Sequence, residues 1–481
     1  MATIDSNPET INASDCVHPQ YTKQAQNWAQ MRDTYEGEQV VKAKGEVYLP
    51  KTAGQEQDPN GNTLYSNYKT RSIFWDYVND TVQDMLGLIN KEPVQYVLPT
   101  QLEDWSKEAG ADGESLKVLY RAVNEQQLIV SRVGLVLDPP ERTDIQSLPR
   151  INRYEAETIL TWDDQNKPPR WVILDESHYE AKNFKYEIKN EYRLLALDGA
   201  DQYYTITFDK FPSLDDVSQP IVAEDPANPS YGEAVYPELN GKRFNKIPIQ
   251  IINAASLSWD TERPMMLGLS NIALASYRGE ADYRLALFMQ AQETLFLKGF
   301  LPDEGQNIRV GAGASVSSVG EQADMKFVGV SGSGLEEMRE SQGHLDAKAQ
   351  DMGVQLKEKS GVESGDALIT RLTVRTATMA TVAETAAMGI RNIIQMAMEW
   401  AGMAGIKDVE VIAPTDFTDS AVDTKAMIDV VSAVERGMFT LEDYHSWLSK
   451  NDYTADQFDE WQEKLATAMR ANLGFSDAQQ Q

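Results

Sequence analysis

The chain has 481 residues, of which 44 are Lys or Arg and 74 are Asp or Glu, so its formal net charge is −30. This excess of negative charge argues against a protein that grips DNA through a basic surface, and against a polybasic membrane-surface protein. The only cysteine, Cys16, excludes an intramolecular disulfide framework and a cysteine-based zinc site, and it predicts a reducing compartment.

The length predicts more than one hydrophobic core. We expect no secretory signal, because the opening MATIDSNPET lacks a basic and an apolar region. We also expect no membrane span, because no uncharged apolar run approaches about 20 residues.

The N-terminal third combines helices with one buried strand. Apolar spacing predicts helices over 21–35, 66–89 and 113–132, and a polar loop over 52–63. The run GLVLDPP at 134–140 predicts a strand that two prolines end.

The middle of the chain is predicted to be rich in strands. Short apolar runs at 171–177, 192–198 and 202–210 predict strands, the last two forming a hairpin about Gly199. A loop rich in Pro and Asp follows at 211–240, and KIPIQIINA at 246–254 predicts another strand.

Helices dominate the C-terminal half. Helices are predicted over 267–289, 335–358 and 371–402, with a glycine-rich island of strand-like pieces between the first two. The second helix carries a heptad seam typical of helix–helix packing, formed by Leu335, Met338, Gln342, Leu345, Ala349, Met352 and Leu356. This seam fits an intramolecular bundle core, a contact between subunits, or both.

The chain ends with a short strand at 409–414 and a helical tail. Within the tail, Thr440 and Asp443 predict a capping box, with Asp in place of the usual Glu or Gln. The predicted fold class is therefore α+β, mainly α.

No motif predicts catalysis, a cofactor or a metal, so we expect a protein that is not an enzyme. The four histidines (His18, His178, His344, His445) lie far apart in sequence, and His344 is predicted to face solvent. The adjacent acidic pairs are poor catalytic dyads, because neighbouring side chains point apart; they are Asp163/Asp164, Asp215/Asp216 and Glu336/Glu337. The glycine-rich pieces lack both the phosphate-loop lysine and the dinucleotide fingerprint.

One basic cluster contrasts with the acidic chain. Lys357, Lys359, Arg371 and Arg375 flank a glycine-containing loop at 360–370. The lysines fit the end of a helix, where cations complement the macrodipole. A mobile loop that faces a polyanion is the alternative interpretation.

The order of several short motifs resembles that of portal (head-to-tail connector) proteins of tailed bacteriophages, over about 21–465. The N-terminal motif residues are Arg32, Asp33, Gly37, Val41, Lys42, Gly45, Tyr48, Leu49, Pro50, Tyr68, Lys69 and Arg71. The central ones are Tyr154, Ile159, Leu160, Trp162, Tyr192, Arg193, Leu194, Leu195, Ile247 and Pro248. The helical ones are Leu267, Leu269, Asn271, Ala273, Ala275, Tyr277, Arg278, Ala281, Asp282 and Tyr283, and the last are Glu399, Trp400, Asp416 and Phe417.

The resemblance implies a portal-type subunit with several parts. These would be a wing at 1–265 of N-terminal helices and a β-rich part, stem helices at 266–292 and 334–358, a small α/β clip at 293–333, a tunnel loop at 359–371, a long tunnel helix with a return to the wing at 372–414, and a helical crown at 415–481. The 211–240 loop has no place in the family pattern.

The resemblance also implies a function. Portal subunits form a ring, with a dodecamer expected, at the unique capsid vertex, and double-stranded DNA passes through it during packaging and ejection. The implied partners are the large terminase, a head-completion or adaptor protein, and the major capsid and scaffolding proteins, with no membrane. The protein would be found in the virion and, during assembly, in the host cytoplasm. Because the terminase carries the ATPase, the missing phosphate-loop lysine agrees with this role.

The resemblance assigns candidate residues to two places. The tunnel loop and DNA channel would include Lys357, Lys359, Ser360, Gly361, Gly365, Asp366, Arg371 and Arg375. The stem seam would include Leu335, Met338, Leu345, Met352 and Leu356. Two alternatives stay open: a helical scaffold or adaptor protein of a virion without a channel, and a hydrolase with two converging carboxylates.

Overall fold

The chain is an α+β protein that divides into two units, Met1–Thr415 and Asp416–Gln481. The computed structural model describes residues 16–140, 148–209, 234–291, 294–298, 324–328, 334–353, 365–403, 405–415, 417, 430, 432, 434, 436, 440–450 and 456–465.

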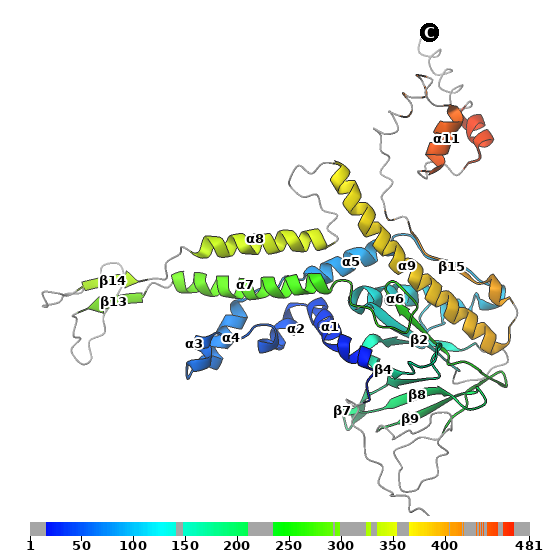
Figure 1. The fold of residues 1–481 in the computed structure, drawn as a ribbon, viewed down its shortest axis with the longest axis horizontal. Coiled ribbons are helices and arrows are strands. Elements are labelled where there is room, and N and C mark those ends of the chain that lie inside the picture. The colour runs from blue at the N-terminus through cyan, green and yellow to red at the C-terminus, as the bar shows by residue number, and fades with distance from the viewer. Residues whose placement is uncertain are drawn as a thin grey trace, which may run out of the picture. The chain divides into compact units, whose positions relative to one another are not determined.

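Figure 1 shows the helices and strands of the first unit. The helices are α1 (Pro19–Glu36), α2 (Glu38–Ala43), α3 (Ala53–Gln57), α4 (Gly61–Arg71), α5 (Tyr77–Ile89), α6 (Leu116–Val130), α7 (Leu267–Ala291), α8 (Leu335–Met352) and α9 (Gly365–Ala401). The strands are β1 (Gln95–Val97), β2 (Arg132–Asp138), β3 (Arg150–Glu155), β4 (Ile159–Trp162), β5 (Trp171–Asp175), β6 (His178–Lys182), β7 (Lys185–Lys189), β8 (Tyr192–Leu197), β9 (Tyr203–Phe208), β10 (Glu238–Leu239), β11 (Lys242–Arg243), β12 (Ile249–Asn253), β13 (Thr294–Lys298), β14 (Asp324–Val328) and β15 (Glu410–Ile412).

Two antiparallel sheets form the β-rich part. One has the strand order β12-β2-β3 and the other β4-β5-β8-β9. The predicted strands correspond to β2, β5, β8, β9, β12 and β15, and the predicted hairpin about Gly199 is confirmed by the pairing of Leu197 with Tyr203. The Asp198 carboxylate accepts hydrogen bonds from the Ala200 and Gln202 amides, which holds this turn.

A charged cluster joins the two sheets. Arg193, on β8, forms ion pairs with Asp138 of β2 at 2.8 Å and with Glu176, just after β5, at 2.7 Å. The Tyr154 hydroxyl, on β3, donates to the same Glu176 carboxylate. Only 11% of the Arg193 side chain is exposed, so these charges are largely withdrawn from water and depend on one another.

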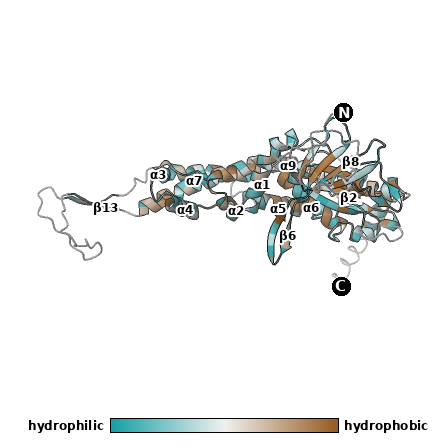
Figure 2. Ribbon diagram, turned by 90° about the horizontal axis from the view of Figure 1, so that it is seen from below, coloured by the Kyte–Doolittle hydropathy of each residue, from teal (hydrophilic) through white to brown (hydrophobic). Residues whose placement is uncertain are grey.

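Helices α6 and α9 pack on the β12–β2 part of the first sheet. Where α9 crosses Ile252 of β12, a Cβ on Gly389 would lie 2.4 Å from that side chain, so the close approach requires a glycine. The Tyr120 hydroxyl of α6 donates to the Ala383 carbonyl of α9 at 3.2 Å. Figure 2 shows hydrophobic ribbon gathered where α9, β2 and β8 lie, which places the main core between these elements.

The single helix predicted over 66–89 is wrong: α4 ends at Arg71 and α5 begins at Tyr77. Ser72 is extended, with φ −64° and ψ 153°, and its hydroxyl donates to the Lys69 carbonyl. The break lets Phe74 pack edge-on against Tyr277 of α7, with ring centroids 5.9 Å apart.

The polar loop predicted over 52–63 is also partly wrong. It contains α3, which begins with a capping box formed by Thr52 and Gln55, and the start of α4. A capping box consists of polar residues, so it leaves no trace in the spacing of apolar residues. The apolar spacing therefore predicts a loop where the short helix α3 lies.

Two predicted boundaries near the long helices change. Helix α8 ends at Met352 rather than 358, because Gly353 is extended (φ −76°, ψ 162°). Helix α9 begins at Gly365 rather than 371 or 372. The sequence Ser364-Gly365-Asp366 carries residue types favoured at helix N-termini, which outweigh the loop-forming tendency of the serine and glycine.

The second unit contains α11 (Leu441–Lys450), where the predicted capping box is confirmed. The Thr440 amide donates to Asp443 at 2.9 Å, and the Asp443 amide donates to the Thr440 hydroxyl at 3.1 Å. Rings from α11 and from the following segment meet around Trp461, which lies 5.8 Å from Tyr444 and 5.3 Å from His445.

None of the helices in the described part of the chain is long and apolar enough to span a membrane.

We predict that Arg193→Met lowers the free energy of unfolding by about 3 kcal/mol, because Asp138 and Glu176 would keep their charges without a cation. Urea unfolding followed by circular dichroism measures this. The matched control is Arg170→Met: its pair with Asp201 is 38% and 65% exposed, so its loss should cost less than about 1 kcal/mol. Equal effects of the two variants would contradict the role given to Arg193.

Candidate functional site

Helices α7 and α8 run side by side and antiparallel (Figure 1). Near the start of α7, a Cβ on Gly268 would lie 2.6 Å from Met352 at the end of α8. Further along, a Cβ on Gly279 would lie 1.9 Å from the Gln342 amide nitrogen. The Ser276 hydroxyl donates to the same Gln342 side chain at 3.2 Å. The two glycines therefore let the helices approach closely, and Gln342 sets their register.

The predicted seam residues of α8 differ in how far they are covered. Ala349 is buried, Leu335 and Leu345 are half-buried, and Met338 and Met352 are 39% and 48% exposed. Leu356 lies outside the described residues. Within one chain the seam is thus only partly covered, and His344 is exposed as predicted.

Two tyrosine hydroxyls tie this helix pair to the N-terminal helices. Tyr68 of α4 donates to Asp282 of α7 at 2.5 Å, and Tyr77 of α5 donates to Asp346 of α8. Burial, followed by these hydrogen bonds, raises the pKa of both hydroxyls well above the ordinary 10.0, so in the folded chain both stay protonated donors even above pH 10. Arg71 adds a cation–π contact, with its guanidinium 3.7 Å from the Phe288 ring centroid.

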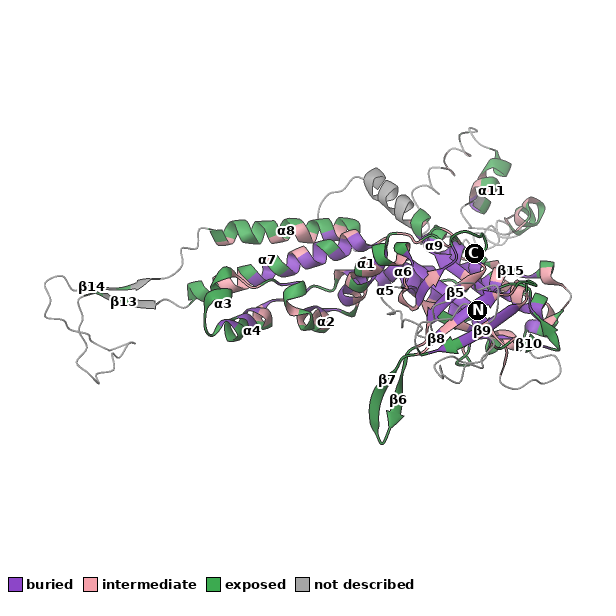
Figure 3. Cartoon of the chain, turned by 60° about the horizontal axis from the view of Figure 1, so that its bottom comes forward, coloured by how far each residue is buried: buried purple, intermediate pink, exposed green. Residues whose placement is uncertain are grey.

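Aromatic side chains from both sides surround these contacts. They form one buried cluster made of Val41, Tyr48, Leu49, Tyr65, Tyr68, Phe74, Ala273, Leu274, Tyr277 and Ala281. In Figure 3 the buried part of α7 lies toward its N-terminal end, and the exposed part toward β13 and β14. The N-terminal part of α7 is therefore packed in the core, and its C-terminal end is exposed.

Residues of the N-terminal and helical motifs contact one another. The Tyr48 hydroxyl donates to Asp33 at 2.6 Å, and Tyr68 donates to Asp282. Arg32 bonds Glu157 at 2.7 Å and the Gln126 side chain at 2.8 Å. These motif positions therefore hold the first unit together.

The segment between α7 and α8 contains a two-stranded antiparallel hairpin. Strand β13 pairs with β14 over five positions, from Thr294 with Val328 to Lys298 with Asp324. The Lys326 ammonium lies 5.6 Å from the Phe296 ring centroid. Both helices thus end at a shared strand pair.

The predicted basic loop is described only in part. Lys357, Lys359, Ser360 and Gly361 lie outside the described residues. Gly365 and Asp366, predicted in the loop, lie on the first turn of α9. Arg371 and Arg375, predicted to flank the loop, also lie on α9, within the helix predicted over 371–402.

The side of α8 that faces away from α7 is acidic. Its exposed charged residues are Glu336, Glu337, Glu340 and Asp351 against Arg339 and Lys348, and Arg339 pairs with Glu336 at 3.4 Å. A pocket of about 290 Å³ near the end of α8 is lined by Tyr77, Asp80, Thr81, Gln83, Asp84, Ala349 and Gly353. Such a lining repels phosphate rather than holding it.

Two residues considered for chemistry in the sequence, His18 and Asp163, have structural roles. His18 caps α1 and stacks on Trp162 at 4.0 Å, and burial lowers its pKa. The Asp163 carboxylate accepts backbone amides of Gln165 and Arg170, which holds a turn. Within the described ranges, no group of three or more His, Cys, Asp or Glu side chains could hold a metal ion.

Pattern reasoning missed the hydroxyl–carboxylate contacts of Tyr68 and Tyr77 and the buried Arg132. The Arg132 guanidinium lies over Trp162, 4.8 Å from its ring centroid, and donates to the Trp259 carbonyl at 2.9 Å. Burial lowers the pKa of Arg132 to about 10. An arginine that opens a strand of otherwise apolar residues was the available signal.

We predict that the Tyr68→Phe/Tyr77→Phe double variant is less stable at neutral pH by about 2 kcal/mol, about 1 kcal/mol for each hydrogen bond removed. Because folding raises both pKa values, their contribution is complete below pH 10 and is lost as the pH rises above it, so the variant's stability should fall less steeply there.

Urea unfolding at a series of pH values measures both effects. The control Tyr179→Phe, at a side chain 70% exposed, should change the stability at neutral pH by less than about 0.5 kcal/mol. Parallel pH curves for the double variant and the parent chain would contradict this assignment.

The sequence matches one family model, described as a domain of unknown function (DUF4055), over residues 265–401. This match spans α7, the β13–β14 hairpin, α8 and α9. No curated protein matches the sequence.

Among solved structures, the chain is similar to chains in structures of a gene transfer agent (GTA) particle. For "Virion of native gene transfer agent (GTA) particle" the TM-score is 0.40 at 11% identity, covering 79% of this chain and 89% of the other. For "Neck of native GTA particle computed with C12 symmetry" the TM-score is 0.38 at 11% identity, covering 77% of this chain and 89% of the other. For "Neck of empty GTA particle computed with C6 symmetry" the TM-score is 0.34 at 12% identity, covering 80% of this chain and 88% of the other. Similarity at this level does not establish a shared fold.

Proposed function

We propose that this chain is the subunit of a phage-type portal, a closed ring at one capsid vertex through which double-stranded DNA passes during packaging and ejection. The observation that carries the proposal is the order of parts. Two antiparallel helices, α7 and α8, share a strand pair at their common end, and the long helix α9 follows them.

On this proposal the chain divides into the portal parts as follows. The wing is 1–265, the stem is α7 with α8, the clip is 293–333, and the crown begins at 415. The tunnel loop would lie between the end of α8 at Met352 and the start of α9 at Gly365.

The incompletely covered stem seam supports a ring. Met338 and Met352 leave 39% and 48% of their surface exposed, and Leu335 and Leu345 on the same helix are only half-buried. A neighbouring copy would cover them, and repetition of one such contact around an axis closes a ring. The seam would therefore act both within one chain and between chains.

The charge distribution supports passage rather than binding of DNA. Each phosphate that a Lys or Arg neutralises adds salt-dependent affinity, and many such contacts would hold the duplex in place. The chain carries −30, about −360 for twelve copies, and α8 exposes mainly carboxylates. Walls of this charge repel the duplex and keep it centred.

The basic cluster would then be the exception at the narrowest point. Lys357, Lys359, Arg371 and Arg375, together with Ser360, Gly361, Gly365 and Asp366, would lie around the constriction and touch DNA transiently. As a portal subunit the chain has no catalysis of its own, and its partners are the large terminase, a head-completion or adaptor protein, and the capsid and scaffolding proteins.

Electron microscopy of the purified full chain tests this function. We expect rings with an axial channel wide enough for duplex DNA. Small oligomers or filaments without a channel would contradict the proposal and would favour the scaffold or adaptor alternative.

We predict that replacing the four basic residues Lys357, Lys359, Arg371 and Arg375 with Gln leaves ring formation intact and weakens the residual affinity of the ring for DNA. The slope of log K against log salt should become shallower by about 0.9 for each phosphate that the variant no longer neutralises. Fluorescence anisotropy with labelled duplex DNA measures both quantities.

The control replaces four exposed lysines elsewhere with Gln: Lys23, Lys107, Lys117 and Lys407. This variant has the same net charge but keeps the proposed constriction. Equal salt slopes for the two variants would place the basic cluster away from DNA.

A further inference from the structure

Strands β6 and β7 form a hairpin in which every residue is exposed (Figure 3). Its two-residue turn is made by Asn183 and Phe184, with φ of 53° and 64°. Positive φ at both turn residues matches the right-handed twist of the strands, so the turn is well formed. The hairpin interrupts the sequence between β5 and β8, which pair directly with each other.

The two faces of this hairpin differ in character. Tyr179 pairs with Ile188 and Ala181 with Tyr186, so these four side chains share one face. The other face carries His178, Glu180, Lys182, Lys185, Glu187 and Lys189. The exposed fractions on the apolar face are 70% for Tyr179, 74% for Tyr186 and 65% for Ile188, and Phe184 at the tip is fully exposed.

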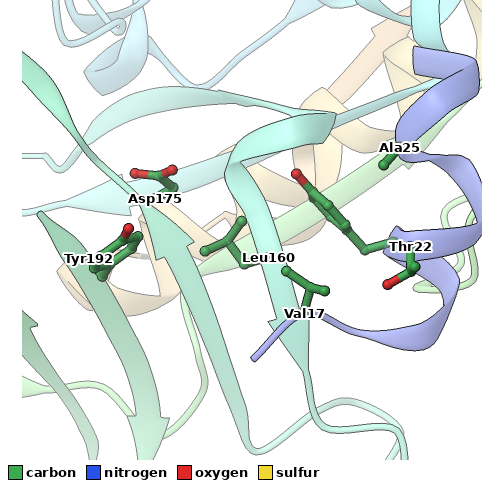
Figure 4. Close-up of a pocket in the computed structure, with 7 residues that line it drawn as sticks. Val17, Thr22, Ala25, Leu160, Asp175 and Tyr192 are labelled. Carbon is green, nitrogen blue, oxygen red and sulfur yellow. The ribbon is translucent and has the colours of Figure 1, made fainter. Parts of the chain in front are cut away.

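An isolated two-stranded hairpin is marginally stable in water, and a face with three large apolar side chains gains from a cover. The same chain offers an apolar pocket at the base of the hairpin. Its volume is about 340 Å³ and it is lined by Val17, Tyr21, Thr22, Ala25, Leu160, Asp175 and Tyr192 (Figure 4). Apart from Thr22 and Asp175, it presents alkyl and aromatic groups, which suit an aromatic ring.

The hairpin cannot fill the pocket of its own chain. Asp175 ends β5 and Tyr192 begins β8, so the pocket borders the residues from which the hairpin leaves the sheet. Five extended residues per strand place the tip roughly 17 Å from this base. A copy of the same chain, displaced by about that length, would bring its tip to the pocket.

Charge complementarity favours a second copy as the occupant. The hairpin carries Lys182, Lys185 and Lys189 against two glutamates, whereas the whole chain carries −30. Lys182, which pairs with Glu180 at 3.4 Å, and Lys185 lie beside the tip, and Asp175 is one of the residues that line the pocket. An aromatic tip flanked by cations therefore matches an apolar pocket with an anion at its edge.

We propose that the β6–β7 hairpin docks on a neighbouring copy of this chain, with Phe184 in the Val17–Tyr192 pocket and its apolar face covered. The contact joins two different surfaces, so it is heterologous and closes a ring when the rotation between copies allows. This proposal rests on the proposed function, because it takes the neighbouring copies to be subunits of the portal ring.

Disulfide crosslinking in the full chain tests the contact, in a Cys16→Ser background that removes the native thiol. We expect Phe184→Cys combined with Thr22→Cys to give a ladder of crosslinked multimers on a non-reducing gel. The matched control, Glu180→Cys with Thr22→Cys, places the thiol on the charged face and should give little crosslinking.

Single variants distinguish the geometry of docking. A mixture of the Phe184→Cys chain with the Thr22→Cys chain should crosslink to dimers and no further, because each pair holds one disulfide. Crosslinking of the Phe184→Cys chain with itself would indicate tip-to-tip pairing and would overturn the proposal.

Phe184→Ser should weaken self-association about tenfold or more, as loss of a buried aromatic anchor does, while Glu180→Ser should not. Sedimentation velocity measures this, and circular dichroism verifies the fold. If Phe184→Ser forms rings as readily as the parent chain, the hairpin contact is overturned and the portal function stands. This holds whether or not the variant loses binding to another virion protein. A parent chain that does not self-associate would overturn both.

Discussion

The close antiparallel packing of α7 on α8 is the constraint on which the rest of this structure depends. Two glycines, Gly268 and Gly279, permit the approach, and Gln342 sets the register through Ser276. Because the helices run in opposite directions, the segment between them must form a shared tip, and the β13–β14 pair does so. The hydroxyl of Tyr68 then binds α7 to α4, and the hydroxyl of Tyr77 binds α8 to α5.

In the first unit the buried charges stabilise the fold, and the exposed charges fit the proposed passage of DNA. Where charges are withdrawn from water, as at Arg193, Asp138 and Glu176, they are paired across elements and hold the sheets together. Where they are exposed, as along α8, they are mostly negative. A conduit for DNA needs this combination, because rigid walls that attracted the duplex would stop its movement.

Two exposed apolar surfaces would supply contacts between copies in the proposed ring. The α8 seam leaves Met338 and Met352 partly uncovered, and the β6–β7 hairpin leaves a whole face uncovered. Both are adjacent to features of the same chain that could receive them: the second helix of the pair for the seam, and the pocket near Asp175 for the hairpin. Repetition of one chain can therefore satisfy surfaces that the isolated chain leaves open.

The sequence by itself determined the net charge, the α+β class and the positions of α1, α6 and α7, because periodic apolar spacing records which face of an element is buried. Only the tertiary structure decided where α4 ends, where α9 begins, and which distant side chains meet. Tyr68 and Asp282 are 214 positions apart, and no local pattern links them. The break at Ser72 exists because Phe74 packs on Tyr277, a gain in burial that outweighs the local preference for one continuous helix.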